Sequence, residues 1–517
     1  MKTAIVKKCG FFAVATIGLM ALSSCSELDE VVYSKDTSSN FYSTSGQVIA
    51  AWNLPYSFLQ GITYSVHFAM EEFPTDEAAA TTKSGQGYEN GTWERFHKHT
   101  WTSQEPFIKY EWSNIFQGIG YCNSFLDAME NRDLSGFQLP VSKAQMVAEI
   151  RLMRAFYYYW AINAFGNVPI VTQVGIPSSP PTAPRAEVFE FIETEILQNI
   201  DQLGEKGDPT WYGHFTRSAA RALLAKLYLN AEVFSGTPRW EDCIAQCDAL
   251  INEGLYSLDE TWDAPFRAYN DNSAENIFVV VYDANNAPGF NAHEQQLHSA
   301  HNQTYNLLYW PWNKIVTQES FYRLYGENDF RINQWLVGPQ YYTENGEQQP
   351  VYGWDGQPLV ITPEITQFVN MAGGDGQGVR NIKYEVEAGV QANMNNDLVI
   401  YRLSDIYFMK AECIMRLNGG MATAEAVDLI NEVRARSFAE GDPDASYTIA
   451  TLTMDELLDE RGREFAYEMK RREDLIRFGR FNDAWWEKAA SDETKQLYPI
   501  PLEILTTNPG LVQNDGY

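Results

Sequence analysis

The residues of this chain best suited to chemistry are aromatic side chains that fall outside any helical pattern. Large aromatic residues on loops usually either pack against the core or bind something. A flat ring can cover the apolar face of a sugar, while Asn, Gln, Arg and Asp side chains pair with its hydroxyl groups, which cost about 1–3 kcal/mol each when buried unpaired. The aromatic residues concerned are Trp93, Trp101, Tyr305, Tyr309, Trp310, Trp312, Tyr352 and Trp354. They favour binding of a hydroxyl-rich ligand by contact.

A competing interpretation is that about half of these aromatic residues pack beneath loops, as such residues often do. Trp310 and Trp312, which flank Pro311 among Asn and Gln residues, are among the binding candidates. The sequence alone leaves both interpretations open for each residue.

Other residues with chemical potential do not form a recognisable catalytic site. The Arg and Glu residues around Arg402 and in 460–477 are predicted to lie on packed helices, where paired ions fix geometry. The carboxylates are too numerous, 68 in all, to single out an acid and a nucleophile. The histidines lack a zinc-site spacing such as H-E-x-x-H, and they are His97, His99, His293, His298 and His301. We therefore expect no catalytic centre, no metal site and no cofactor, although calcium at Asp and Asn clusters stays open.

The elements that must position these residues are mainly helices. Apolar residues recur every three or four positions from Met146 to Ala164, after a Ser142-x-x-Gln145 capping box, and again from Val188 to Leu203. Thr216 is a good N-cap for the next helix. Further helices are expected over 240–252, 403–417, 422–436 and after a Thr453-x-x-Glu456 capping box, and a short strand is expected at 496–500. Pairs of helices joined by short turns resemble tetratricopeptide packing, without a clean 34-residue repeat.

The centre of the chain differs from both ends. Residues 256–396 contain few periodic runs and are rich in Gly, Pro, Asn and aromatic residues, with a short β-like run at Ile277–Tyr282. Long irregular segments are uncommon unless they are functional. We predict a mainly α domain over 41–517, in which an irregular ligand-binding layer (256–396) is mounted on an N-terminal helical part (41–255) and a C-terminal helical part (397–517).

The N-terminal residues resemble an export signal. Lys2, Lys7 and Lys8 precede an apolar run, 9–22, which is too short to span a bilayer. The run ends in Leu22-Ser23-Ser24-Cys25, which resembles a bacterial lipobox. We therefore expect a signal peptide over 1–24, lipidation of Cys25 and an acidic flexible leader over 25–40. The alternative is an ordinary signal peptide with an incidental Cys.

Charge and cysteine content exclude some classes of protein. The formal net charge is −30, and it becomes −33 without residues 1–24, which carry three Lys and no acid. Such a surface repels nucleic acid and anionic lipid. No zinc or disulfide framework is indicated by the remaining cysteines, which we expect to be buried thiols: Cys122, Cys243, Cys247 and Cys413.

Short motifs in a fixed order make the chain similar to the SusD/RagB family. Each is weak alone, but their order over the whole chain is specific. They are Thr75-Asp76-Glu77; Arg154-Ala155-Phe156-Tyr157-Tyr158 with Phe165-Gly166-Asn167-Val168-Pro169; Thr216 with Ala219-Ala220 and Leu223-Leu224-Ala225; Asn396-Asp397 with Tyr401-Arg402-Leu403-Ser404-Asp405; Glu460-Arg461 with Glu464-Phe465 and Glu468; and Pro499-Ile500-Pro501. Met469 and Arg472 depart from the Gly and Trp that many members carry, and we expect this to tune local packing.

The resemblance implies a role as well as a fold. It implies a lipid-anchored protein on the exterior of the outer membrane, which captures a glycan and closes it into a TonB-dependent SusC-like transporter. In starch-binding members, ligand contacts come from regions that correspond here to Asp76, Lys83, Trp93, Arg95, Tyr309, Trp310 and Trp312. The same lid role with a peptide cargo is the alternative. A helical-repeat adaptor without a small ligand, and less favourably a glycan-cleaving enzyme, also stay open.

Overall fold

The computed structural model describes residues 42–175 and 179–517. The predicted signal peptide (1–24), Cys25 and the leader (25–40) therefore lie outside the described residues. No helix within the described ranges is long and apolar enough to cross a membrane.

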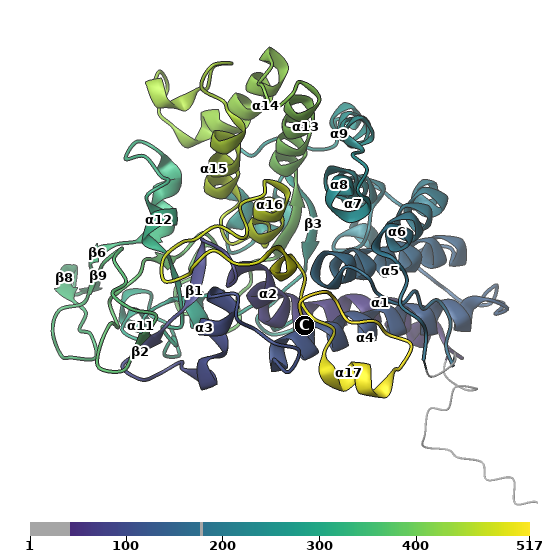
Figure 1. The fold of residues 1–517 in the computed structure, drawn as a ribbon, viewed down its shortest axis with the longest axis horizontal. Coiled ribbons are helices and arrows are strands. Elements are labelled where there is room, and N and C mark those ends of the chain that lie inside the picture. The colour runs from purple at the N-terminus through teal and green to yellow at the C-terminus, as the bar shows by residue number, and fades with distance from the viewer. Residues whose placement is uncertain (1–41, 176–178) are drawn as a thin grey trace, which may run out of the picture.

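The N-terminal part is a series of paired helices, which confirms the mainly α prediction (Figure 1). Helix α4 packs on α5, α5 on α6, and α7 on α9. The side chain of Ser142 accepts a hydrogen bond from the backbone of Gln145 and forms the predicted capping box, and Thr216 caps α7. The helices are α1 (Ser45–Ile62), α2 (Phe68–Glu72), α4 (Pro106–Met129), α5 (Lys143–Phe165), α6 (Arg185–Asn199), α7 (Arg217–Leu229), α8 (Ala231–Ser235) and α9 (Trp240–Glu253).

The C-terminal part continues the same series, because α13 packs on both α9 and α14. Its helices are α13 (Leu403–Leu417), α14 (Ala424–Arg434), α15 (Met454–Phe465), α16 (Arg471–Arg477) and α17 (Leu502–Thr507). Two sequence predictions are wrong here. Thr453 does cap α15, but the Glu456 carboxylate accepts from Tyr447 at 2.7 Å instead of closing a capping box. The strand expected at 496–500 is absent from the named strands of the described ranges, since 493–496 form a 3-10 turn.

The irregular part carries short two-stranded ladders, on the left of Figure 1. The expected strand near 277 is present as β3 (Asn276–Val280), antiparallel to β12 (Leu398–Arg402). The other pairs are β1 (Ala78–Ala80) with β4 (Ile315–Thr317), β2 (Thr82–Lys83) with β10 (Val369–Asn370), β5 (Trp335–Leu336) with β11 (Arg380–Asn381), β6 (Gly338–Pro339) with β9 (Val360–Ile361), and β7 (Tyr341–Glu344) with β8 (Glu347–Pro350). Short helices join them: α3 (Thr92–His97), α10 (Ala292–Gln296), α11 (His301–Thr304) and α12 (Glu319–Tyr322).

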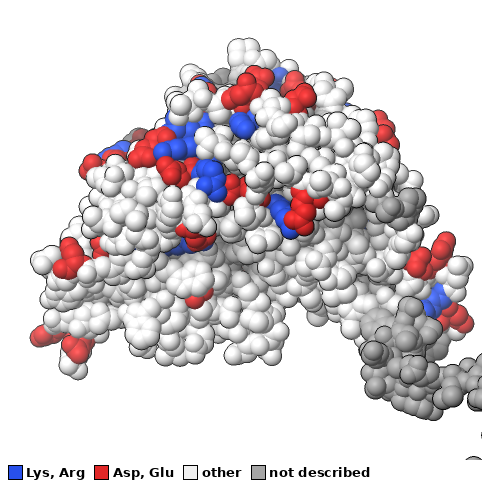
Figure 2. All heavy atoms as spheres, turned by 60° about the horizontal axis from the view of Figure 1, so that its bottom comes forward, with Lys and Arg blue, Asp and Glu red and all other residues white. Residues whose placement is uncertain are grey.

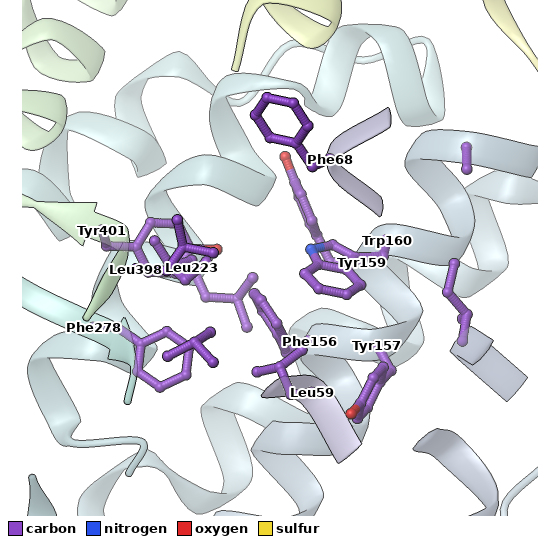
Figure 3. Close-up of a cluster of buried hydrophobic side chains, with 14 of the residues drawn as sticks. Leu59, Phe68, Phe156, Tyr157, Tyr159, Trp160, Leu223, Phe278, Leu398 and Tyr401 are labelled. Atoms are coloured by element: carbon purple, nitrogen blue, oxygen red, sulfur yellow. The ribbon is translucent and has the colours of Figure 1, made fainter. Parts of the chain in front are cut away.

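A continuous core joins the helical and irregular parts. Side chains of α5 face those of α1, α7, β3 and β12 in Figure 3. The ring of Phe156 lies 4.9 Å from that of Trp160 and 5.8 Å from that of Phe278. Because such aromatic contacts are closely packed, the irregular layer is mounted on a rigid base.

Candidate functional site

The most exposed aromatic side chain of the irregular layer, that of Trp310, projects from residues 308–314, which we call the aromatic loop. Leu308 is 63% exposed, Trp310 72% and Trp312 54%. Pro311, between the two tryptophans, is buried. Asn313, which follows Trp312, is buried as well, so exposed and buried residues alternate from Trp310 to Asn313.

Asn313 fixes the base of this loop. It is buried and adopts a left-handed backbone with φ of +55°. Its carbonyl oxygen accepts from Lys83 Nζ at 2.9 Å, and its side-chain oxygen accepts from Nε and Nη2 of Arg380 at 2.9 and 2.7 Å. Its amide nitrogen donates to the carbonyl of Asp375 at 2.9 Å. These bonds satisfy each polar group of the Asn313 side chain and hold the loop in one shape.

Lys83 and Arg380 therefore support the loop from below. Lys83 is 2% exposed and donates only to carbonyl oxygens, including that of Lys314 at 3.1 Å. Burial, with a smaller contribution from Arg380, holds the pKa of Lys83 well below its usual value. Burial also lowers the pKa of Arg380 to about 9. The expectation that Lys83 contacts a ligand is corrected: it positions the loop that carries the exposed rings.

Two neighbouring segments flank the aromatic loop. The backbone nitrogens of Trp312 and Lys314 donate to the carbonyls of Glu294 and Gln295, in α10, at 2.6 and 2.8 Å. On another side, Lys314 Nζ lies 3.3 Å from the carboxylate of Glu89. Tyr88, next to Glu89, is 46% exposed. We call Tyr88, Leu308, Trp310 and Trp312 the aromatic surface.

Trp93 and Trp101 belong to the core, which corrects the prediction that they contact ligand. They are 2% and 1% exposed. Trp93 packs against Phe73 and Phe107, and its ring lies 4.4 Å below the ammonium of Lys314. Trp101 donates from its indole nitrogen to the Tyr517 hydroxyl at 2.6 Å. As folded, neither ring has a free face for a sugar.

Asp76 and Arg95 are occupied by ion pairs. Both carboxylate oxygens of Asp76 accept from Arg471, at 2.8 and 2.7 Å. Arg95 makes a two-point contact with Glu105, at 2.7 and 2.8 Å, and is about one-third exposed. Asp76 lines a different cavity, of about 730 Å³, together with Trp485 and Trp486. The structure therefore separates Asp76 from the aromatic surface, while Arg95 lies in the segment that follows Tyr88.

Tyr305, just before the aromatic loop, and Tyr309, within it, are half-buried. Both pack in a small apolar cluster with Leu297, Leu307 and Val390. Burial raises the pKa of Tyr305 to about 12. The Tyr309 hydroxyl is buried and has no hydrogen-bond partner within the described part of the chain. These rings shape the loop more than they offer a face to a ligand.

Trp354 is tied to the same frame through Asp375. Its backbone nitrogen donates to Asp375 Oδ2 at 2.7 Å, and its indole nitrogen donates to Ser299 at 2.8 Å. Hydrogen bonding to His298 lowers the pKa of Asp375 to about 2. Because the carbonyl of Asp375 also accepts from Asn313, the half-buried Trp354 and the aromatic loop are fixed to one residue. Tyr352, two residues earlier, is 56% exposed.

The charged residues around α15 form a buried ion network. Arg402 donates to Glu275, Glu464 and Glu468 at 2.8–2.9 Å. Burial alone would raise the pKa of Glu460, but Arg331 and Arg463 beside it lower that pKa to about 2. Such paired ions fix geometry between packed elements. Among the described residues, no group of three or more His, Cys, Asp or Glu side chains is placed to hold a metal ion.

The net negative charge is unevenly distributed. Figure 2 turns the bottom of Figure 1, where α3, α4 and α17 lie, toward the viewer. Charged side chains gather in the upper part of that view and at its edges, while most of its lower part is uncharged. A neutral ligand or an uncharged protein surface can approach this face without the repulsion that the net charge implies.

The sequence predicted some of the exposed residues of the candidate site but not the residues that hold the aromatic loop in place. Trp310 and Trp312 are exposed as expected of ligand contacts, whereas Tyr88 and Leu308 were not predicted. Asn313, Asp375 and Arg380 were also missed, because no local pattern links three residues so far apart. The one available signal was Asn directly after the Trp-Pro-Trp run, since Asn tolerates left-handed backbone.

Two family models match the chain. One, described as the SusD family, matches residues 274–517, and another, described as starch-binding associating with outer membrane, matches residues 56–229. The starch-binding protein SusD of Bacteroides thetaiotaomicron is 23% identical over 88% of this chain and 86% of that protein. SusD-like protein P25 of Formosa agariphila is 22% identical, over 80% of each chain.

Solved structures share the fold. A laminarin-binding SusD-like protein superposes with a TM-score of 0.72 at 22% identity, covering 92% of this chain and 100% of that one. Surface glycan-binding protein A from Bacteroides thetaiotaomicron, in complex with laminarihexaose, gives a TM-score of 0.69 at 20% identity, covering 91% and 99%. These similarities extend over nearly the whole described chain.

Proposed function

The chain belongs to the SusD family, and on that premise we propose that it binds a glycan through the aromatic surface and delivers it for import. The observation that carries the proposal is the exposure of Trp310 and Trp312 on a loop fixed by Asn313. Exposing two large rings on a rigid frame costs hydration free energy, which a ligand that covers them recovers.

The surroundings of the rings suit a polyhydroxylated ligand. The Lys314 ammonium belongs to the loop itself, and the Glu89 carboxylate and the Glu294 side chain lie on the segments that flank it. They can exchange hydrogen bonds with ring hydroxyl groups while the indoles cover C–H faces. We expect micromolar to millimolar affinity, about −8 to −4 kcal/mol, which allows release to a transporter.

We further propose that the acyl chains on Cys25 hold the protein on the exterior of the outer membrane, beside a SusC-like TonB-dependent transporter. Two features support this: the lipobox-like residues before Cys25, and the match to a family described as associating with the outer membrane. The tether would keep the protein at high effective concentration over its partner. Labelling with a radioactive fatty acid should depend on Cys25, and copurification of a TonB-dependent transporter tests the partnership.

The binding proposal is tested by calorimetric titration of the purified protein with a panel that includes maltoheptaose and laminarihexaose. We expect heat from at least one glycan, lost in the double variant Trp310→Ala/Trp312→Ala. Tyr110→Ala is the matched control, because Tyr110 is 50% exposed but lies on α4. Silence with every glycan and heat from peptides would replace the glycan by a peptide cargo.

We propose binding without cleavage. Chromatography of the same glycans after prolonged incubation should show unchanged chain lengths. Shorter products that disappear in Glu89→Gln or Glu294→Gln would identify an enzyme instead.

A further inference from the structure

A second cavity lies apart from the aromatic surface. It has a volume of about 580 Å³ and opens between residues 205–216, residues 270–274 and β3. It shares no lining residue with the aromatic loop or with the residues that hold that loop. Its size is within the range of sites that take small molecules.

A buried carboxylate orients His214 in this cavity. Glu149, in α5, is fully buried and accepts from Trp52 Nε1 at 2.8 Å, from the Tyr56 hydroxyl at 2.5 Å and from His214 Nδ1 at 2.7 Å. The imidazole also packs between the rings of Trp52 and Tyr56, at 4.5 and 4.7 Å. Because a carboxylate only accepts, Nδ1 carries a proton toward Glu149, and in this tautomer Nε2 is an acceptor.

The cavity wall holds a hydrogen-bond acceptor whose donor is not supplied by the described residues. His214 Nε2 has no hydrogen-bond partner among the described residues, although the side chain lines the cavity. The one ammonium in the lining, that of Lys206, already donates to the carbonyls of Ser273 and Ala274, at 3.2 and 2.8 Å.

A ligand that fits this wall carries no negative charge and offers several hydrogen-bond donors. Glu205, Asp208 and Asp271 line the cavity and would repel an anion. A sugar offers several O–H donors and an apolar face for Tyr212, which is 42% exposed. We infer that this cavity is a second binding site for a mono- or disaccharide unit, in which a ligand hydroxyl donates to Nε2 of His214.

The inference is tested by imidazole ¹⁵N NMR with maltose, laminaribiose and cellobiose as probes at concentrations up to 50 mM. His214→Phe identifies the resonance of His214, and buried His293, which lies outside the cavity, serves as the internal control. We expect at least one disaccharide to move the Nε2 resonance of His214 while that of His293 stays fixed. The same shift should persist in Trp310→Ala/Trp312→Ala, so this test does not depend on ligand binding at the aromatic surface.

Two results would overturn the inference. In one, all three disaccharides leave the Nε2 resonance of His214 unchanged at 50 mM. In the other, the shift disappears in the Trp310→Ala/Trp312→Ala variant, which would place the sugar on the aromatic surface alone.

Discussion

Two pairs of tryptophans show what decides whether an aromatic residue becomes core or surface. Trp93 and Trp101 are 2% and 1% exposed, whereas Trp310 and Trp312 are 72% and 54% exposed. Trp93 lies in α3, among Phe73, Phe96 and Phe107. In the aromatic loop the buried positions are taken by Pro311 and Asn313 instead, so both indoles are left outside. Whether a tryptophan is buried or exposed therefore depends on the neighbours that fill the interior and not on the residue type.

The largest effect expected from this comparison is on folding. Trp93→Ala should lower the free energy of unfolding by about 3–5 kcal/mol, because it leaves a cavity in packed aromatic surroundings. Chemical denaturation monitored by circular dichroism measures this, with Trp310→Ala as the matched control. A loss below about 1 kcal/mol would mean that the α3 region is not part of the stable core.

The α3 region should also respond to pH. Burial lowers the pKa of His97 from its ordinary value of 6.5 to about 4. Between these values the unfolded chain binds more protons, so stability present above pH 6.5 is lost as pH falls toward 4. His97→Gln keeps a donor for the Trp486 carbonyl but cannot titrate. The drop in unfolding free energy from pH 7 to 5 should therefore shrink by roughly 2 kcal/mol in the variant. An equal drop in unfolding free energy in both proteins would contradict the lowered pKa of His97.

The aromatic loop should show the opposite pattern. Trp310→Ala should weaken glycan binding about tenfold, or ~1.4 kcal/mol, because one ring face is lost. Its free energy of unfolding should change by less than about 0.5 kcal/mol, as for other surface substitutions. Calorimetric titration and denaturation of the same sample measure both. Unchanged affinity together with lost stability would erase the distinction between the two pairs.

The smallest expected effect concerns Arg95. Arg95→Lys loses the two-point contact with Glu105. Because the side chain is about one-third exposed, the loss should be about 0.5 kcal/mol of stability. Glycan affinity should stay within about twofold of the parent protein, since the Arg95 guanidinium is occupied by Glu105. A tenfold loss of affinity would bring Arg95 into the binding surface.

The fold was largely predictable because its helices carry repeating local signals. The capping box at Ser142, the cap at Thr216 and the apolar period between them each reflect contacts within a few residues of the chain. The hydrogen bond from Lys83 to the carbonyl of Asn313 joins residues 230 positions apart, and no local sequence preference encodes such a contact. Glu456 was misread for a different reason, because Tyr447 and Arg463, nine and seven residues away, compete with the cap for its carboxylate.

The candidate site was only partly predictable. Residue type and loop context made Trp310 and Trp312 candidate ligand contacts but did not separate them from the buried Trp93 and Trp101. Exposure depends on what covers a ring in three dimensions, and Phe73 covers Trp93 from another segment. Lys83 was assigned to the ligand from the resemblance to starch-binding family members, yet backbone carbonyl oxygens take the place of water around its ammonium.

The left-handed residue at the base of the aromatic loop has an evolutionary consequence. Asn313 and its partners determine the course of the backbone, while the side chains at 308, 310 and 312 project without contributing to that course. Substitutions at these three positions would thus alter the proposed ligand surface with little effect on folding. Ligand preference could therefore change during evolution through a few exposed side chains, while the backbone that Asn313 holds stays the same.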